Sequence, residues 1–212
     1  MNMNGRRIVL ATGNPGKARE IGAMLAPAGI DIVSQAEFGL ESADETAVTF
    51  VENALLKARH AAAGSGLAAI ADDSGLLVDA LGGAPGVHSA RYAGDCGDAA
   101  NIRKLLTELQ DVPTARRGAR FICVAVLLRH PDDPLPLICE GRWEGVIASA
   151  PRGEEGFGYD PVFLPRGDTR SAAELPAAEK NRLSHRGHAF NALLARLRDA
   201  AGDGALLTGG AP

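Results

Sequence analysis

Residues 6–17 read RRIVLATGNPGK, and this stretch indicates the fold class. It joins an apolar run of strand length to a Gly-Asn-Pro-Gly turn, and Pro15 suits the first position of a helix. The residues that follow have the i, i+3, i+4, i+7 spacing of one apolar helix face: Ile21, Met24, Leu25 and Ala28. The stretch therefore predicts a strand, a tight turn and a helix, which is a building unit of α/β folds.

Strand and helix signals continue along the chain without a strict strand–helix–strand order. Apolar runs predict further strands at residues 30–34, 67–71, 76–81, 120–129, 135–148 and 161–164. Helices are expected over 50–63, behind a capping box of Thr49 and Glu52, around 102–109, and at the carboxyl end behind a Ser184 cap. We expect an α/β fold with a mixed β-sheet flanked by helices, and two lobes with a cleft.

Two details of this pattern concern pairing and boundaries. The runs at 67–71 and 76–81 bracket a polar turn, and those at 120–129 and 135–148 are expected to pair antiparallel. No linker separates independent domains, so we expect one domain over residues 1–201 and a flexible tail at 202–212.

Composition and charge argue against several classes of protein. The 212 residues carry 22 basic and 26 acidic side chains, and this net charge of −4 gives no reason to expect a nucleic-acid polymer or an anionic membrane as partner. The longest apolar run, Phe121–Leu128, is far shorter than the ~20 residues that span a bilayer, and the first residues lack the pattern of a secretory signal. The three cysteines are expected to be reduced thiols of a cytoplasmic protein: Cys96, Cys123 and Cys139.

Lysine is rare in this chain. It occurs only at Lys17, Lys57, Lys104 and Lys180, and arginine supplies the other 18 of the 22 basic residues. A lysine is a compact donor on a flexible stem, so we interpret these four as positions where an ammonium group is wanted. The alternative interpretation is that the low number of lysines arose by chance.

The turn after the first strand is a candidate anion site. The free N–H groups of the first helical turn, the helix dipole and Lys17 together would suit a phosphate. The spacing fits neither a Walker A loop nor the dinucleotide-binding glycine motif. Taken alone, the hexapeptide Thr12–Lys17 is also compatible with an ordinary helix start.

Asp72-Asp73-Ser74-Gly75 comes where an apolar strand is expected to end, a frequent place for catalytic groups in α/β sheets. Adjacent carboxylates repel, and a divalent cation or a lysine would stabilise both in the ionised form. Oxygen ligands of this kind suit Mg²⁺. The motif is equally compatible with an Asx turn, and Asp44 and Glu45 can be either a further ligand source or a solvated acidic loop.

Two later segments offer groups that could bind a planar ring. Gly156–Asp160 places two aromatic residues among glycines in a loop, where a ring could stack. Ser184-His185-Arg186 provides hydroxyl, imidazole and guanidinium donors, with Lys180 one helical turn upstream. A helix cap followed by a solvated turn is the alternative for this second segment. No third ligand accompanies His185 and His188, which argues against zinc.

Taken together, these segments resemble the inosine/xanthosine triphosphate pyrophosphatase family. The matching motifs run in the family's order from about Arg6 to Leu197: Thr12–Lys17, Thr49–Lys57, Ala71–Gly75, Gly82–Gly86, Ser89–Gly94, Gly156–Asp160, Glu179–Lys180 and Ser184–Arg186. The resemblance implies an elongated α/β fold with a cleft between two lobes, a requirement for Mg²⁺, a homodimer, and conversion of dITP, ITP and XTP to the monophosphate and pyrophosphate.

The resemblance also implies roles for residues of this chain. Triphosphate contacts fall on Thr12, Gly13, Asn14, Pro15, Gly16 and Lys17, and Lys57 lies near the phosphates. Asp73 takes the position of the proton acceptor and Mg²⁺ ligand, Asp72 that of an assisting carboxylate, and Ser74 that of a substrate contact. The second metal carboxylate falls on Asp44, where relatives often have glutamate, and Glu45 can substitute. Base and sugar contacts fall on Phe157, Gly158, Tyr159, Asp160, Lys180, His185 and Arg186.

The implied mechanism is a single displacement by water, with pyrophosphate as the leaving group. Two other functions remain open at this point. One is a pyrophosphatase for pyrimidine or other modified nucleotides, and the other is a nucleotide sensor that binds without turnover. A substrate panel and an Asp73→Asn variant separate these possibilities.

Overall fold

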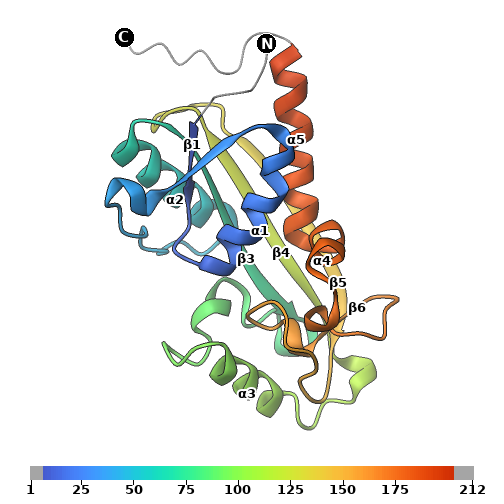
Figure 1. The fold of residues 1–212 in the computed structure, drawn as a ribbon. Helices are drawn as coiled ribbons and strands as arrows, with labels where there is room; N and C mark the ends of the chain where they lie inside the picture. Colours follow the sequence, from blue (N-terminus) through green and yellow to red (C-terminus); the bar gives the residue numbers. More distant parts are fainter. Residues whose placement is uncertain (1–6, 203–212) are drawn as a thin grey trace. The chain divides into compact units, whose positions relative to one another are not determined.

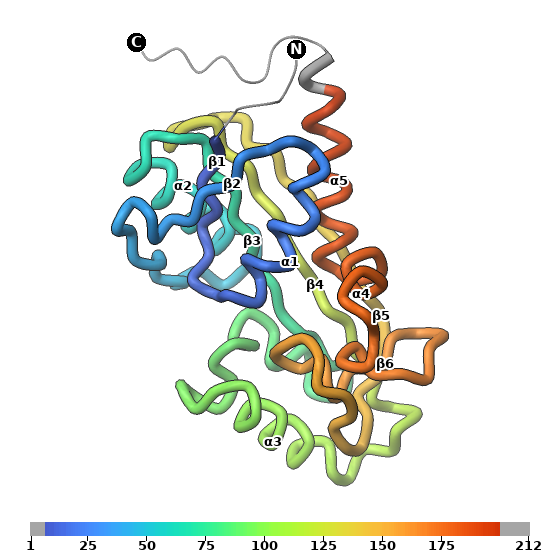
Figure 2. The backbone as a smooth tube through the Cα atoms, viewed as in Figure 1, coloured from blue at the N-terminus to red at the C-terminus, as the bar shows by residue number. Residues whose placement is uncertain are grey.

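The computed structural model describes residues 7–202, and its centre is a six-stranded sheet (Figures 1 and 2). The strands lie in the order β2-β1-β3-β4-β5-β6. Their bounds are β1 Arg7–Ala11, β2 Asp31–Ser34, β3 Ala68–Val78, β4 Gly118–Leu128, β5 Leu137–Ile147 and β6 Phe163–Pro165. β1 runs parallel to both β2 and β3, whereas β5 and β6 are antiparallel. The expected mixed sheet with flanking helices is confirmed.

The α-helices are close to those that the sequence predicts. They are α1 Pro15–Leu25, α2 Phe50–Ser65, α3 Asp98–Glu108, α4 Ala177–Leu183 and α5 His185–Gly202. Short 3₁₀ helices occur at Ala26–Ala28, Gln35–Phe38, Asp79–Leu81, Gly86–Arg91, Thr114–Arg116, Asp160–Val162 and Ala172–Glu174. The Ser184 hydroxyl accepts the Gly187 N–H at the start of α5, as expected of a cap. The predicted tail at 202–212 lies, from residue 203 on, outside the described residues.

The chain forms two compact units. Unit 1 contains the chain up to Asp73, Val124–Glu140 and the chain from His188, and unit 2 contains Ser74–Cys123 and Gly141–Gly187. In unit 1, α2 presents alanines to the interior, and four of them have no exposed surface: Ala54, Ala58, Ala61 and Ala62. These small side chains let the helix backbone approach its neighbours closely.

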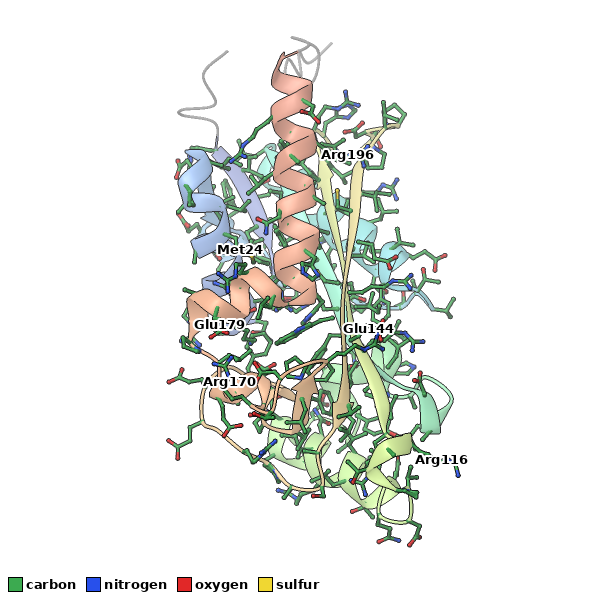
Figure 3. All side chains as sticks on the ribbon, turned by 90° about the vertical axis from the view of Figure 1, so that its right-hand side faces the viewer. Met24, Arg116, Glu144, Arg170, Glu179 and Arg196 are labelled. Atoms are coloured by element: carbon green, nitrogen blue, oxygen red, sulfur yellow. The ribbon has the colours of Figure 1, made fainter. Side chains whose placement is uncertain are left out.

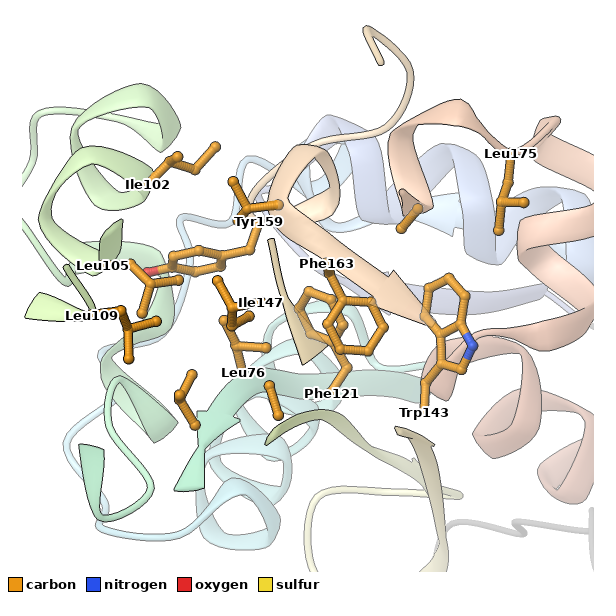
Figure 4. Packing of buried hydrophobic residues seen from close by; sticks show 14 residues of the cluster. Leu76, Ile102, Leu105, Leu109, Phe121, Trp143, Ile147, Tyr159, Phe163 and Leu175 are labelled. Carbon is orange, nitrogen blue, oxygen red and sulfur yellow. The ribbon is translucent and has the colours of Figure 1, made fainter. Parts of the chain in front are cut away.

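Unit 2 has a core rich in aromatic rings (Figure 4). The rings of Phe121 and Phe163 have centroids 4.7 Å apart, and those of Trp143 and Phe163 are 5.2 Å apart. Burial of each such side chain contributes about 1.5–3 kcal/mol to folding. Near this core, Arg170 pairs with Glu179 on α4 (Figure 3), at 2.8 Å. This contact ties α4, which carries Lys180, to the preceding loop.

The prediction of a polar turn at residues 72–75 is wrong. β3 is one strand from Ala68 to Val78, and Asp72 and Asp73 are buried within it. Burying two adjacent carboxylates is costly unless cations pair with them. Lys17 and Lys57, from distant parts of the chain, supply that pairing, and the strand therefore continues through the motif.

Other sequence predictions concern thiols, membrane-spanning segments and strand pairing. All three cysteines are free, and Cys123 and Cys139 are buried. None of the described helices is long and apolar enough to cross a membrane. β4 and β5 are neighbours in the sheet, as the pattern of residues 120–148 predicts.

Candidate active site

The register of β1 and β3 positions the first part of the site. Ala11 lies opposite Ala71 in this parallel pair. Because the two strands run in the same direction, the turn that follows Ala11 and the carboxylates that follow Ala71 leave the pair at the same end. Thr12–Lys17 and Asp72-Asp73 are therefore neighbours in unit 1.

The helix start after β1 is capped by its own side chain. The Asn14 Oδ1 atom accepts the N–H groups of Gly16, at 2.8 Å, and of Lys17, at 3.1 Å. Pro15 occupies the expected first turn, and the Asn14 N–H donates to Thr12 Oγ1. The prediction of free first-turn N–H groups is wrong for Gly16 and Lys17, because an asparagine cap satisfies both. An anion at this turn would have to displace Asn14 or bind to Lys17.

Lys17 reaches from this turn to β3. Its Nζ atom lies 3.0 Å from Oδ2 of Asp72, whose side chain has no exposed surface. The lysine side chain itself is 15% exposed, so its ammonium pairs with a buried carboxylate without being fully enclosed. This arrangement lets one cation pair with Asp72 and still meet a ligand.

Lys57 joins two further carboxylates. Its Nζ atom lies 2.9 Å from Asp73 Oδ1 and 2.7 Å from Glu45 Oε1. Asn53, one turn earlier on α2, donates from Nδ2 to Asp73 Oδ2 at 3.4 Å. Glu45, which the sequence analysis gives as the substitute for Asp44 as second metal carboxylate, thus contacts Lys57. Asp44 is exposed, and its role as a metal ligand stays a prediction.

Burial and charge act in opposite directions on this cluster. Burial lowers the pKa of the Lys57 ammonium, but the carboxylates of Asp73, Asp72 and Glu45 outweigh it, so the pKa is raised. Burial is also the largest effect on Asp73, and it raises the pKa of this carboxyl in spite of Lys57 and Lys17. Asp73 is therefore a stronger base than an exposed aspartate.

The cluster contains more carboxylates than ammonium groups, which favours binding of a cation. Three carboxylates, those of Glu45, Asp72 and Asp73, face two ammonium groups, which leaves one net negative charge. Glu45 and Asp73 already converge on one cation, Lys57. Among the described residues no three His, Cys, Asp or Glu side chains gather into a metal site. Two carboxylates nevertheless suffice for Mg²⁺, which takes its other ligands from water and phosphates.

In unit 2, Lys180 joins the loop at 156–160 to α4. Its ammonium donates to Asp160 Oδ2 and lies 5.0 Å from the centroid of the Phe157 ring. Asp160 also accepts the Phe157 N–H at 2.9 Å. Gly156 is necessary here, because a Cβ on it would lie 2.1 Å from Asp160 Oδ2. The loop thus presents an aromatic ring beside a buried, paired ammonium.

Arg186 and His185 differ in what they present. The Arg186 NH2 group donates to Ser74 Oγ at 3.4 Å, and its guanidinium lies 5.4 Å from the Phe157 ring centroid. The His185 ring stacks on Phe121, with centroids 4.6 Å apart and an interplanar angle of 10°. Because one ring face is covered, His185 would meet a substrate through an edge nitrogen.

Tyr159 belongs to the core of unit 2. It is 3% exposed, and its hydroxyl donates to the Ser89 carbonyl at 2.9 Å. The core therefore accounts for one of the two aromatic rings in this loop, and Phe157 is the ring that remains for stacking. The Gly158 N–H donates to Asp98 at 2.7 Å, a contact that fixes the loop to α3.

Sequence reasoning missed Asn53, which contacts Asp73 in unit 1, and Asp98, which contacts the loop at 156–160 in unit 2. The structure buries Asn53, which is 1% exposed. The available sequence signal was its position one helical turn before Lys57, on the same side of the predicted helix. Asp98 has no comparable signal, because its partner is a backbone group 60 residues away.

One cavity of about 430 Å³ lies in unit 1, and its lining does not include Glu45, Asp72 or Asp73. Thr12 is the predicted site residue that lines it. The other lining residues are mostly apolar and come from β1, α1 and the β2 region: Leu10, Ala18, Gly22, Ala26, Ile30, Ile32, Ser34 and Glu37. The acidic cluster is therefore not part of this cavity.

Comparison with known families agrees with the motifs. The Ham1 family model matches residues 8–196. With this fold and this match over most of its length, the chain belongs to the Ham1 family. The resemblance derived from the sequence motifs is confirmed.

Individual relatives match nearly the whole chain. A protein of Yersinia pseudotuberculosis named dITP/XTP pyrophosphatase is 59% identical over 196 residues, which cover 92% of this chain and 100% of the relative. A protein of Escherichia coli strain K12 with the same name is 55% identical over 195 residues, with coverage of 92% and 99%. The solved structure of a HAM1 protein from Coxiella burnetii has a TM-score of 0.85 at 49% identity, with coverage of 92% and 100%.

Proposed function

We propose that the chain hydrolyses dITP, ITP and XTP to the nucleoside monophosphate and pyrophosphate, and so removes deaminated purines from the nucleotide pool. The observation that carries this proposal is the cluster of three carboxylates and two ammonium groups at the end of the β1–β3 pair. The names of the relatives, dITP/XTP pyrophosphatase, support the same reaction.

The residues of unit 1 would act on the triphosphate. Lys17 and Lys57 stabilise negative charge on phosphate oxygens, and Asp73 accepts the proton of the attacking water at a carboxylate oxygen. Asp72 keeps Lys17 oriented through its 3.0 Å ion pair. Mg²⁺, when bound, would be held by Asp73 with Glu45 or Asp44 and would neutralise phosphate charge.

The residues of unit 2 would act on the base and sugar. Phe157 offers a ring face for stacking, and Lys180, His185 and Arg186 offer hydrogen-bond donors. Hypoxanthine and xanthine carry an acceptor at position 6, whereas adenine carries an amino donor there. A fixed donor such as the Arg186 guanidinium therefore favours the first two, since an unpaired donor costs about 1–3 kcal/mol.

The proposal extends to the assembly and its location. We infer a homodimer from the family resemblance, and a cytoplasmic enzyme from three free thiols, which persist in reducing compartments. Sedimentation of the purified protein tests the dimer.

A substrate panel tests the reaction. The purified protein is incubated with Mg²⁺ and dITP, ITP, XTP, dGTP, dATP, dTTP or dUTP, and monophosphate and pyrophosphate are quantified. We expect dITP, ITP and XTP to give equal amounts of both products at the highest rates. Faster hydrolysis of dTTP or dUTP would identify a different nucleotide pyrophosphatase, and binding without products would identify a sensor.

A further inference from the structure

The segment 40–47, which we call the acidic strap, lies along one stripe of α2. Leu40 packs on Gly64, where an added Cβ would come within 2.4 Å of its Cδ2 atom. The Glu41 carbonyl lies 2.9 Å from His60 Nε2, and Glu45 pairs with Lys57. At the other end, the Ala47 N–H donates to Asn53 Oδ1 at 3.0 Å, and Asn53 Nδ2 donates to the Ala47 carbonyl at 3.3 Å.

These contacts follow a regular register. The helix partners are spaced by four, three and four residues, the spacing of one face of an α-helix: Asn53, Lys57, His60 and Gly64. The strap residues meet them in the reverse order, so the strap runs antiparallel to α2. A segment without regular secondary structure is thus fixed to the helix at four successive points.

The strap is also held on its other side. Gln35, which is buried, donates from Nε2 to Ser42 Oγ at 3.2 Å. Ser42 Oγ in turn lies 2.5 Å from where a Cβ on Gly13 would be. The strap therefore packs against the turn at Thr12–Lys17 as well as against α2, and Glu45 lies between these anchors.

Asn53 links the strap to β3. Its amide holds both backbone groups of Ala47 and also donates to Asp73 Oδ2, and the residue is 1% exposed. Lys57 alone would be a poor clamp, because its long side chain is flexible and can follow a moving carboxylate. The short, enclosed Asn53 amide has no such freedom.

We propose that Asn53 is a positioning residue that sets the placement of Glu45 relative to Asp73 by locking the acidic strap onto α2. The proposal rests on the proposed function, in which these two carboxylates serve the triphosphate and its metal ion. Its consequence is that Asn53 and Glu45 act as one unit, so a substitution of Asn53 has little further effect once the Glu45 carboxylate is absent.

A double-mutant cycle tests this coupling. Asn53→Ala is expected to lower kcat for dITP by about 10- to 100-fold, since small displacements of reacting groups have effects of this size. It is also expected to raise the Mg²⁺ concentration needed for half-maximal rate. In a Glu45→Gln background, the same Asn53→Ala substitution is expected to change kcat less than about threefold. Equal effects in both backgrounds would overturn the proposal.

Ser65→Ala is the matched control. Ser65 lies at the opposite end of α2, donates to the Ala61 carbonyl and accepts the Leu67 N–H. Its loss therefore removes two side-chain hydrogen bonds at this helix, where the loss of Asn53 removes three. We expect wild-type kcat and wild-type Mg²⁺ dependence from this variant. A loss like that of Asn53→Ala would mean that general weakening of α2, not the strap, explains the effect, and would contradict the proposal.

Hydrogen exchange on the nucleotide-free and metal-free protein provides a readout besides activity. Loss of the Asn53 acceptor is expected to speed exchange of the Ala47 amide by about tenfold or more. His60→Ala, a change at an exposed residue that allows folding, is expected to increase exchange in the strap and lower kcat less than Asn53→Ala does. Unchanged exchange at Ala47 in Asn53→Ala would overturn the proposal. If the wild-type protein failed to hydrolyse dITP, the proposed function would fail, and the exchange result would still decide the role of Asn53 in the strap.

Discussion

The Nζ atom of Lys57 lies 2.9 Å from Oδ1 of Asp73, and both side chains are more than nine-tenths buried. Such a pair stabilises the fold weakly, because removing both charges from water offsets most of their attraction. It places a carboxylate whose pKa burial raises next to an ammonium group. The acidic cluster is therefore better explained by chemistry than by stability.

The Asp73→Asn variant tests whether the Asp73 carboxylate serves activity more than stability. The folded-state pKa of Asp73 is raised, so its contribution to stability is fully present below the unfolded value and is lost as the pH rises through the folded value. In metal-free buffer at pH 7, the variant is expected to unfold at the same or a higher urea concentration than wild type. Turnover of dITP is expected to fall by about 10²–10⁴-fold. A clear loss of stability together with wild-type turnover would contradict both expectations.

Lys57→Met leaves Asp73 and Glu45 without their shared cation. Removing one partner of a buried ion pair costs about 3–5 kcal/mol, so we expect a large drop in the free energy of unfolding at pH 7. The drop is expected to shrink as the pH falls, because protonation neutralises the stranded carboxylates. Urea titrations at pH 7 and pH 5 measure it. A loss that is the same at both pH values would mean that lost packing of the lysine stem is responsible.

Gly156→Ala is expected to disturb the base-binding residues. The new Cβ would lie 2.1 Å from Asp160 Oδ2 and 3.1 Å from Lys180 Nζ, and the φ angle of +79° adds strain of about 1–2 kcal/mol. We expect a KM for dITP raised about tenfold or more, the equivalent of one lost polar contact. Gly167→Ala is the control, since it has a φ of +84° but open space around the new methyl group. Equal KM values in the two variants would show that strain alone is responsible.

The Asp133→Asn variant tests the stability provided by an ion pair that is not part of the candidate site. The Arg129 guanidinium, with the backbone N–H groups of Arg129 and Leu135, holds the pKa of the Asp133 carboxyl below its usual range. Its contribution is present above the unfolded pKa and is lost as the pH falls through the folded value. We expect a loss of about 2 kcal/mol at pH 7 that disappears in strong acid, with unchanged turnover. Unfolding curves at pH 7 and in strong acid well below pH 3 check the stability, and a dITP assay at pH 7 checks the rate.

Local signals predicted much of the fold. The Pro15 helix start, the Thr49 cap of α2 and the Ser184 cap of α5 are all present, because capping depends on residues two or three positions apart. The continuous course of β3 was not predictable in this way. Asp72 and Asp73 resemble a turn until their lysine partners, 55 and 16 residues away, are known.

In the candidate site, too, some features were predictable from local sequence and others depend on distant residues. Lysine rarity singled out four lysines. The structure pairs Lys17, Lys57 and Lys180 with carboxylates, whereas Lys104 donates to the Tyr92 carbonyl. The choice between Asp44 and Glu45 depends on the register of the acidic strap, which residues of α2 determine, and no local pattern reveals it. Asn14 likewise caps its own turn, although the sequence alone suggested free N–H groups there.

The central claim is that water attacks the phosphorus from which pyrophosphate departs, with Asp73 taking the proton. Hydrolysis of dITP in H₂¹⁸O, followed by mass spectrometry of both products, measures this most directly. The account predicts one ¹⁸O atom in the monophosphate and none in the pyrophosphate, with product formation reduced to trace level in Asp73→Asn. Label in the pyrophosphate, or release of inorganic phosphate as the first product, would contradict it.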